Sequence, residues 1–488
     1  MILAIDIGTT AVKCALFARD GDAGGTTEPG ACIAVGRAPV SAEGVREETN
    51  AHVWSSAVQA AIARLAHGGG AVTACVVTGN GPTLIPCDAA GEPVGRALTW
   101  LHARARLEAR EVAERTGIAV DASFSLPKAL WLARRRPATF ERSAWLLSCA
   151  EWVVFLLTGC AHTAIGAHGV DRFYWSDEAL AALGLDAARF PPFAVAGAAI
   201  GRVTRRAAER FGIAAGARVY AGAADFQMAL IGSATVTAGR TLDRSGSSEG
   251  INHASPAPVA DPRLIVLPHL VDGLHNLGGV TSASGRALSW LAHSASPSPV
   301  EVSVAVERGA AAPAGARRAL FLPYLSGERT PHWNAEASAA FLGLTLRHGW
   351  DEMARAVLES VGFAIRQIIA ILAEHGCRVE ELTACGGPAR HDAWNRIKAD
   401  VTGVPVRTLA NPEADLVGCA CVALTAEGHC DDLASAAAAL VRPGREFEPD
   451  RSLAGLYAEL FDAYQRAAGA LQPLYPHLGG GSGSVGQP

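Results

Sequence analysis

The stretch ILAIDIGTTAVKCALF, residues 2–17, decides the fold. An apolar run up to Ile7, broken only by Asp6, is followed by a glycine–threonine turn at residues 8–10 and then by a second apolar run. This order predicts two strands joined by a tight turn. A glycine turn with two hydroxyls lets N–H groups and side-chain oxygens approach a phosphate, and an acid beside it can hold hydrated Mg²⁺. An ordinary hairpin turn is the alternative interpretation.

Segments with strand and helix character alternate along the rest of the chain. Residues 31–35 and 72–77 are strand-like, and residues 54–67 are helical in pattern. Residues 351–375 form the clearest predicted helix, with acids in the first turn, apolar residues at three-to-four spacing and a terminating Gly376. This alternation is typical of an α/β protein.

The sequence indicates two similar folding units. The strand and turn at residues 242–248 loosely echo residues 6–10, and Gly-, Ser- and Thr-rich sequence at 232–242 separates two β-type segments. The end of the chain has the composition of a flexible linker. The predicted division is an N-terminal domain at 1–236, a C-terminal domain at 237–475 and a flexible tail at 476–488.

Composition limits the classes of partner. The chain has 488 residues and a formal net charge of -5, which gives no electrostatic case for nucleic acid or an anionic membrane. No apolar run approaches the roughly 18 residues that a membrane helix needs. The N-terminus has no signal-peptide pattern, so we expect a cytoplasmic location and reduced cysteines. A homodimer stays open.

Lysine is scarce in this arginine-rich chain. It occurs only at Lys13, Lys128 and Lys398. Lysine is a compact point charge that arginine cannot always replace near phosphate, so its position three residues after the Gly-Thr-Thr turn favours a phosphate role for Lys13. No Gly-Lys pair exists in the chain, which excludes a Walker A loop.

Five segments, in order and spacing, resemble the signatures of FGGY sugar kinases, relatives of actin: residues 6–13, 222–225, 245–249, 339–359 and 386–390. Within the family, LPYLSGERTPH at 322–332 looks closest to xylulokinases. The similarity covers essentially residues 1–475. It implies an α/β fold with two actin-like (ribonuclease H-like) βββαβαβα domains and an ATP/sugar cleft between them.

The resemblance also implies roles for individual residues. Asp225 would be the base that accepts the proton of the attacking sugar hydroxyl, and Asp6 would hold Mg²⁺ through water. The residues implied for ATP phosphates are Thr9, Thr10, Lys13, Gly246 and Ser247, and those for adenosine are Gly386, Gly387 and Asn395. The residues implied for the acceptor are Asn80, Gly81, Trp100, His102, Asp225 and Phe226.

The sugar-binding motifs depart from the family pattern more than the phosphate motifs do. His102 stands where an acid is usual, Phe226 follows the implied base, and Pro388 replaces a third glycine, which could remove one contact to the nucleotide. We therefore expect ATP-dependent phosphorylation of a ketopentose such as xylulose. The alternatives are a kinase for another pentulose, a tetritol or a sugar acid, and a catalytically weak sensor of ATP and sugar.

Overall fold

The structure is a computed structural model that describes residues 1–19, 30–40, 46–65, 71–294 and 299–478. The chain forms two compact units. The first contains residues 1–234, 268–272 and 414–440, and the second contains residues 235–267, 273–413 and 441–488. The first unit thus takes in two later segments of the chain. Of the flexible tail predicted at 476–488, residues 479–488 lie outside the described residues, and Tyr475–Leu478 form helix α16.

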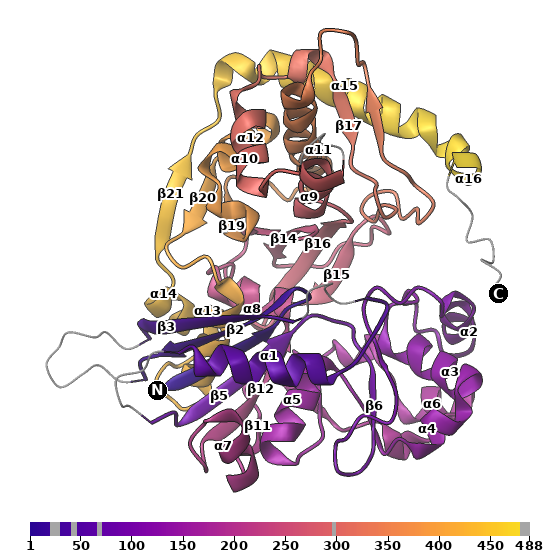
Figure 1. The fold of residues 1–488 in the computed structure, drawn as a ribbon, viewed down its shortest axis with the longest axis vertical. Helices are drawn as coiled ribbons and strands as arrows, with labels where there is room; N and C mark the ends of the chain where they lie inside the picture. The colour runs from indigo at the N-terminus through magenta and orange to yellow at the C-terminus, as the bar shows by residue number, and fades with distance from the viewer. Residues whose placement is uncertain (20–29, 41–45, 66–70, 295–298, 479–488) are drawn as a thin grey trace, which may run out of the picture. The chain divides into compact units, whose positions relative to one another are not determined.

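The first unit is built on one mixed sheet (Figure 1). Its strands, in spatial order, are β11 (Ala199–Arg202), β12 (Arg218–Ala224), β5 (Ala74–Gly79), β1 (Ile2–Ile7), β2 (Ala11–Phe17) and β3 (Cys32–Pro39). The longer helices of this unit are α1 (His52–Ala63), α2 (Arg106–Thr116), α3 (Ser125–Arg135), α5 (Cys149–Thr158), α8 (Asp225–Gly232), α13 (Ala414–Ala426) and α14 (Leu433–Leu440).

The second unit repeats this plan. Its strands, in spatial order, are β15 (Ile265–Pro268), β16 (His275–Thr281), β14 (Glu249–Ser255), β13 (Thr241–Ser245), β19 (Leu382–Gly386), β20 (Val406–Leu409) and β21 (Pro443–Phe447). Its main helices are α9 (Gly285–Ser294), α10 (Val302–Ala311), α11 (Trp350–Glu374), α12 (Asp392–Thr402) and α15 (Ala454–Leu471).

The two sheets share one topology. In each, the first strand is antiparallel to the next strand of its hairpin and parallel to a strand on its other side: β1 with β2 and β5, β13 with β14 and β19. A further parallel strand and an antiparallel edge strand follow in each, β12 with β11 and β20 with β21. The predicted α/β class, the hairpin at 2–17 and the repeat of two units are therefore confirmed.

The core of the second unit forms around helix α11. Its apolar residues at three-to-four spacing, such as Val357, Val361 and Ile368, are buried. Among the described residues, α11 is the one helix long and apolar enough to cross a membrane, and 78% of its most apolar window is buried in the protein. This is the burial expected of a core helix.

Helix α8 is held closely against α13 in the first unit. A Cβ added to Gly232 would lie 1.9 Å from the carbonyl oxygen of Ala414, so only glycine permits this approach. The contact between the helix backbones fixes the direction of α8, and α8 begins at Asp225.

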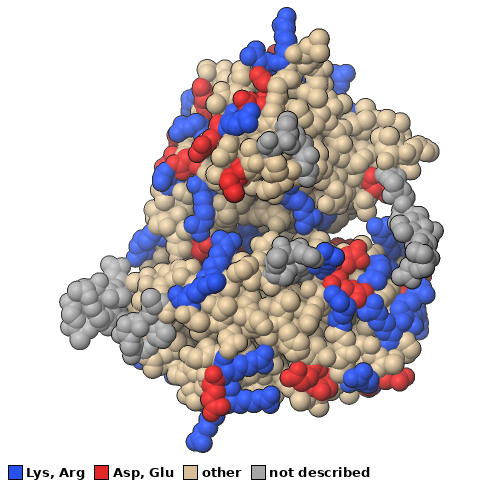
Figure 2. All heavy atoms as spheres, in the orientation of Figure 1, with Lys and Arg blue, Asp and Glu red and all other residues tan. Residues whose placement is uncertain are grey.

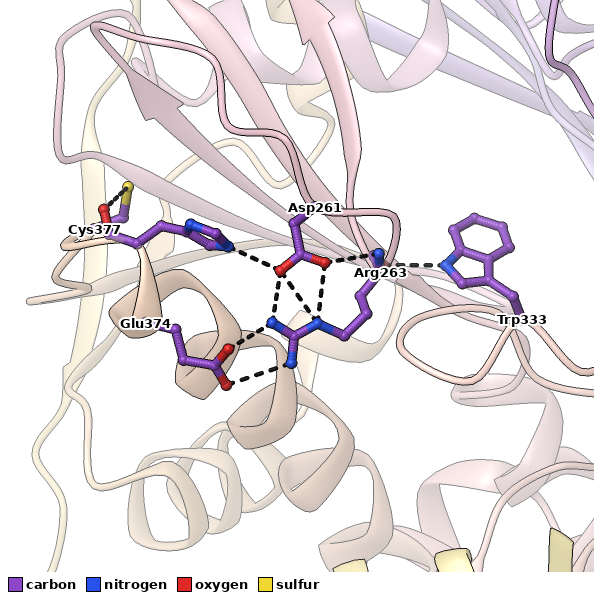
Figure 3. Close-up of polar contacts among 6 residues, drawn as sticks. Asp261, Arg263, Trp333, Glu374 and Cys377 are labelled. Atoms are coloured by element: carbon purple, nitrogen blue, oxygen red, sulfur yellow. Dashed lines mark hydrogen bonds and ion pairs between the residues drawn. The ribbon is translucent and has the colours of Figure 1, made fainter.

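A polar network joins the β14–β15 connection to the end of α11 in the second unit (Figure 3). Arg263 donates from Nη2 to Asp261 Oδ2 at 2.6 Å and to Glu374 Oε2 at 2.5 Å. These contacts with Arg263 hold the pKa of Asp261 well below its usual range. Trp333 Nε1 donates to the Arg263 carbonyl oxygen at 3.2 Å.

The surface charges are mixed in sign. Figure 2 shows cationic and anionic side chains interspersed on the face that it draws.

Candidate functional site

The carboxyl edge of the first sheet gathers the residues implied in chemistry. Strands β1, β5 and β12 run parallel, and Gly79 is the register partner of both Ile7 and Ala224. The turn after Ile7, the segment after Gly79 and the residue Asp225 therefore all begin at the same level of one sheet edge. Ligands of open α/β sheets bind at such carboxyl edges.

The first turn of this edge places a cation beside an acid. Asp6 and Lys13 are register partners across the β1–β2 hairpin, with 3.5 Å between Lys13 Nζ and Asp6 Oδ2. The side chain of Lys13 is 18% exposed and that of Asp6 is 5% exposed. Trp100 Nε1 donates to Thr9 Oγ1 at 3.2 Å, and the Val40 N–H donates to the Thr10 carbonyl oxygen at 3.0 Å.

Asp225 occupies the first position of helix α8, directly after strand β12. It is half-buried, and the N–H of Phe226 donates to its Oδ1 at 2.7 Å. A carboxylate at a helix N-terminus is stabilised by the helix dipole. The carboxylate is thus oriented by the backbone of its own helix.

The residues expected to contact the acceptor differ in exposure. Asn80 is buried and donates from Nδ2 to the Ile7 carbonyl oxygen at 2.7 Å, so it ties the two adjacent strand ends together. Gly81 is exposed. His102 is fully buried, packs edge-on against Trp131 with 4.7 Å between ring centroids, and neither ring nitrogen has a hydrogen-bond partner among the described residues.

Burial lowers the pKa of His102 to about 4, with Arg104 and Lys128 acting in the same direction. The ring is therefore neutral at pH 7, and it can both donate and accept a hydrogen bond. The acid usual at this position could only accept.

Two further polar side chains belong to this part of the first unit and were not assigned a role from the sequence. Lys128 is fully buried on α3, and its Nζ donates to the Pro82 carbonyl oxygen at 2.8 Å. Burial lowers its pKa to about 7. Gln227 is buried on the first turn of α8, and its Nε2 has no hydrogen-bond partner among the described residues. In the sequence, only the scarcity of lysine drew attention to Lys128. Only its position two residues after Asp225 drew attention to Gln227.

The carboxyl edge of the second sheet brings together the second turn and the glycine loop. Ser245 and Gly386 are register partners on the parallel strands β13 and β19. Gly386 has a φ of 89°, and a Cβ there would lie 2.0 Å from the Ser245 carbonyl oxygen. Glycine is therefore required for this close approach. Gly246 is half-buried, and Ser247 and Gly387 are exposed beside it.

Pro388 and Asn395 shape the loop after Gly387. Pro388 begins a short 3₁₀ turn over residues 388–390, a position where its missing N–H leaves no helix hydrogen bond unmade. Asn395 is fully buried on α12, and its Nδ2 donates to the Ala389 carbonyl oxygen at 2.7 Å. Asn395 thus fixes the loop, and its direct contact with adenosine stays a prediction.

The donors for a metal ion are few. Within the described parts of the chain, no group of three or more His, Cys, Asp or Glu side chains could hold a metal ion. Asp6 supplies one carboxylate at the first turn. One carboxylate fits Mg²⁺, which usually keeps several waters and binds through one or two carboxylates together with substrate phosphates.

The structure therefore brings the implied residues together as two sets. Thr9, Thr10, Lys13, Asp6, Asn80, Gly81, Trp100, His102, Asp225 and Phe226 belong to the first unit, and Gly246, Ser247, Gly386, Gly387 and Asn395 belong to the second. Each set includes residues at the carboxyl edge of a sheet. Fold and edges define an α/β protein of two related units, each with a glycine turn suited to phosphate.

The comparisons with known proteins identify the family. Residues 1–232 match the N-terminal domain and residues 244–427 the C-terminal domain of the FGGY family of carbohydrate kinases. The xylulose kinase of Escherichia coli is 30% identical over 424 residues, which cover 83% of this chain and 85% of that protein.

Two solved structures are similar over nearly the whole chain. The xylulose kinase of Rhodospirillum rubrum has a TM-score of 0.78 at 28% identity, covering 97% of this chain and 99% of that one. The gluconate kinase of Lactobacillus acidophilus has a TM-score of 0.83 at 24% identity, covering 98% and 99%, and its likeness concerns the fold.

The chain belongs to the FGGY family of carbohydrate kinases, and it is a sugar kinase. The predicted family, the two-domain actin-like class and the enzyme class are confirmed. Membership implies ATP as the phosphoryl donor and a divalent metal, with a sugar as the acceptor.

Proposed function

We propose that this protein transfers the γ-phosphoryl group of MgATP to a hydroxyl of a ketopentose such as xylulose, with Asp225 as the general base. The observation that carries the proposal is the common sheet edge, at which Asp225 follows β12 while the phosphate turn at residues 8–10 follows β1. A base and a phosphate turn at one edge can align an acceptor hydroxyl with a phosphoryl group.

The proposed reaction needs one base from the protein in addition to ATP and the sugar. Asp225 takes the proton of the sugar hydroxyl, the oxygen forms a bond to the γ-phosphorus, and the bond from that phosphorus to the bridging oxygen breaks to release ADP. Phosphoryl transfer depends mainly on positioning and neutralisation of charge, so one carboxylate is a sufficient base. The N–H of Phe226 keeps the Asp225 carboxylate in one orientation.

The other residues are assigned to ligand groups according to the unit in which they lie. Thr9, Thr10 and Lys13 contact the β- and γ-phosphates, and Gly246 and Ser247 serve the phosphates from the second unit. Gly386 and Gly387 accommodate adenosine, in a loop fixed by Asn395. Asp6 holds Mg²⁺ through water. A bound Mg²⁺ supplies charge neutralisation at the phosphate oxygens.

A second candidate is a kinase for another polyol or a sugar acid. His102, with neither ring nitrogen partnered among the described residues, favours it, because a neutral imidazole offers an acceptor different contacts from an acid. Asn80, Gly81 and Trp100 line the same edge and would contact either acceptor. A catalytically weak sensor is the third candidate, and the presence of Asp6, Lys13 and Asp225 argues against it.

The test is a coupled assay of ADP release over a panel of pentuloses, tetritols and sugar acids. The proposal expects the highest kcat/KM with a ketopentose and ³¹P evidence of a phosphorylated sugar. A higher kcat/KM with a sugar acid would favour the second candidate. Binding of ATP without turnover of any acceptor would refute the kinase assignment.

Cytoplasmic location, the lack of nucleic-acid and membrane partners, and a homodimer stay predictions.

A further inference from the structure

A buried cluster of charges lies at the base of the second phosphate turn. Lys398 on α12 is 1% exposed, and Asp243 and Glu249 are 0% exposed. Lys398 Nζ donates to Asp243 Oδ2 at 2.8 Å and also contacts Glu249 Oε1. A buried lysine without such partners would be strongly destabilising, so these contacts are obligatory for the fold of this region.

Hydroxyl groups complete the cluster. Lys398 Nζ donates to Ser245 Oγ at 2.7 Å, Ser245 Oγ donates to Glu249 Oε1 at 2.8 Å, and Ser284 Oγ donates to Glu249 Oε2. Ser245 and Glu249 are the register partners that close the β13–β14 hairpin. The cluster thus forms hydrogen bonds with the residues on both sides of the turn at 246–248.

The three charged groups of the cluster shift one another's pKa values. Burial raises the pKa of Asp243 well above its usual range, and the Glu249 carboxylate adds to the shift. Burial opposes ionisation of Glu249, but Lys398 outweighs it and lowers the pKa of that carboxyl. Burial likewise opposes the charge on Lys398, and the two carboxylates outweigh it and raise its pKa. The Lys398 ammonium thus lies between the two acids and offsets their charge in this buried site.

The backbone of the turn is anchored on its other side by the start of α9. The Gly246 carbonyl oxygen accepts from Gly285 N at 3.1 Å, and the Ser247 carbonyl oxygen accepts from Ser284 N at 3.0 Å. In a trans peptide the C=O and the following N–H point in opposite directions. The N–H groups of Ser247 and Ser248 therefore point away from α9, an arrangement of successive donors that suits an anion.

We propose that Lys398 is a positioning residue for the phosphate groups of the nucleotide: it neutralises the acids at the base of the 246–248 turn and holds the turn in the conformation that receives phosphate. This inference rests on the proposed function, since it takes this turn as a phosphate site. Without the ammonium, at least one buried carboxylate would repel an anionic ligand at short range through a medium of low dielectric constant. Lys398 acts through the turn and does not itself touch the nucleotide.

The test separates a phosphate-directed role from general support of the fold. Calorimetric titration of ADP and of adenosine is carried out on the wild type, Lys398→Met and Lys398→Met/Glu249→Gln. The single variant should bind ADP at least tenfold more weakly while its affinity for adenosine changes less than twofold. The double variant, which removes the Glu249 carboxylate together with the ammonium that pairs with it, should recover most of the ADP affinity.

The matched control is Arg355→Met. Arg355 is also buried and paired within the second unit, with Nε donating to Glu359 Oε1 at 2.6 Å and Nη2 to Tyr457 on α15. This variant should lose stability without a preferential loss of ADP over adenosine. If Lys398→Met does not fold, Lys398→Gln, which keeps polar contacts and removes the charge, carries the same expectation.

The outcomes are distinct. Equal weakening of ADP and adenosine, or an unchanged ADP affinity, would overturn the positioning role. Wild-type protein that binds neither ligand would instead refute the proposed nucleotide site, whatever the variants do.

Discussion

The two hairpins that carry the glycine turns differ in where they place their lysine. In the first unit, Lys13 stands on the hairpin itself, next to Asp6 and partly exposed. In the second, Lys398 reaches the hairpin from α12 and is enclosed by Asp243 and Glu249. The same strand topology thus carries a partly exposed lysine at one edge and a buried, paired lysine at the other.

This difference indicates that the two sheet edges have different roles in the proposed reaction. The first edge also carries Asp225, the proposed base, whereas the second carries the glycine loop with Gly386. A charge fixed beside a reacting phosphate stabilises the charge that develops there, and a buried, paired cluster keeps a binding surface rigid. We therefore expect changes at the first edge to affect turnover and changes at the second to affect nucleotide binding.

The largest effect should follow Asp225→Asn. The variant keeps the shape of the side chain and removes the base, so kcat should fall by about 10²–10⁴-fold, the usual contribution of general-base catalysis. ADP affinity measured by calorimetry should stay within twofold of wild type. Unchanged kcat would mean that another group is the base, and a parallel loss of ADP affinity would contradict the separation of roles between the two edges.

The second prediction compares how much each of the two lysines contributes to the stability of the protein. Lys398→Met leaves buried carboxylates without their cation and should lower the free energy of unfolding by about 3–5 kcal/mol. Lys13→Met removes a lysine that is 18% exposed and lies 3.5 Å from the buried Asp6, so it should lower it by less than Lys398→Met does, while reducing kcat/KM for ATP. Urea denaturation of both variants measures the difference, and equal losses would show that the environments of the two lysines are alike.

Much of this arrangement could be predicted from the sequence, because it depends on local pattern. The apolar runs around Asp6 and the glycine–threonine turn fix the first hairpin, and the periodicity of residues 351–375 fixes α11. The echo at residues 242–248 predicted a strand and a turn and indicated two similar units, and the repeated sheet topology confirms both.

The buried charges could not be predicted, because they depend on contacts between distant segments. Lys398 meets Asp243 across 155 positions, and Lys128 meets Pro82 across 46. Neither pairing leaves a local pattern. The role of Asn395 as a support of the loop likewise depends on burial, which a single polar residue on a helix does not reveal.

The third prediction concerns two adjacent glycines of the second edge. Gly386→Ala combines a positive φ with a contact at 2.0 Å, and it should cost about 3 kcal/mol in stability and weaken ADP binding. Gly387→Ala is the matched control for stability, since a Cβ there meets no atom within 4 Å among its described neighbours. Differential scanning calorimetry of both variants makes the comparison, and equal losses of stability would contradict the described loop.

The smallest effect is a pH dependence of stability that belongs to the first edge. Because burial holds the pKa of folded His102 at about 4, below the value of about 6.5 in an unfolded chain, the unfolded state binds the proton more readily between these values. Stability should therefore be full above about pH 6.5 and fall as the pH drops, by about 1.5–2 kcal/mol from this group between pH 7 and pH 5. His102→Gln should remove this share of the dependence and alter the KM for the acceptor while leaving that for ATP unchanged. Urea unfolding of both proteins at several pH values measures this dependence. If the free energy of unfolding changed with pH equally in both, His102 would not be held neutral by burial. Its environment would then not contrast with that of the charged cluster around Lys398.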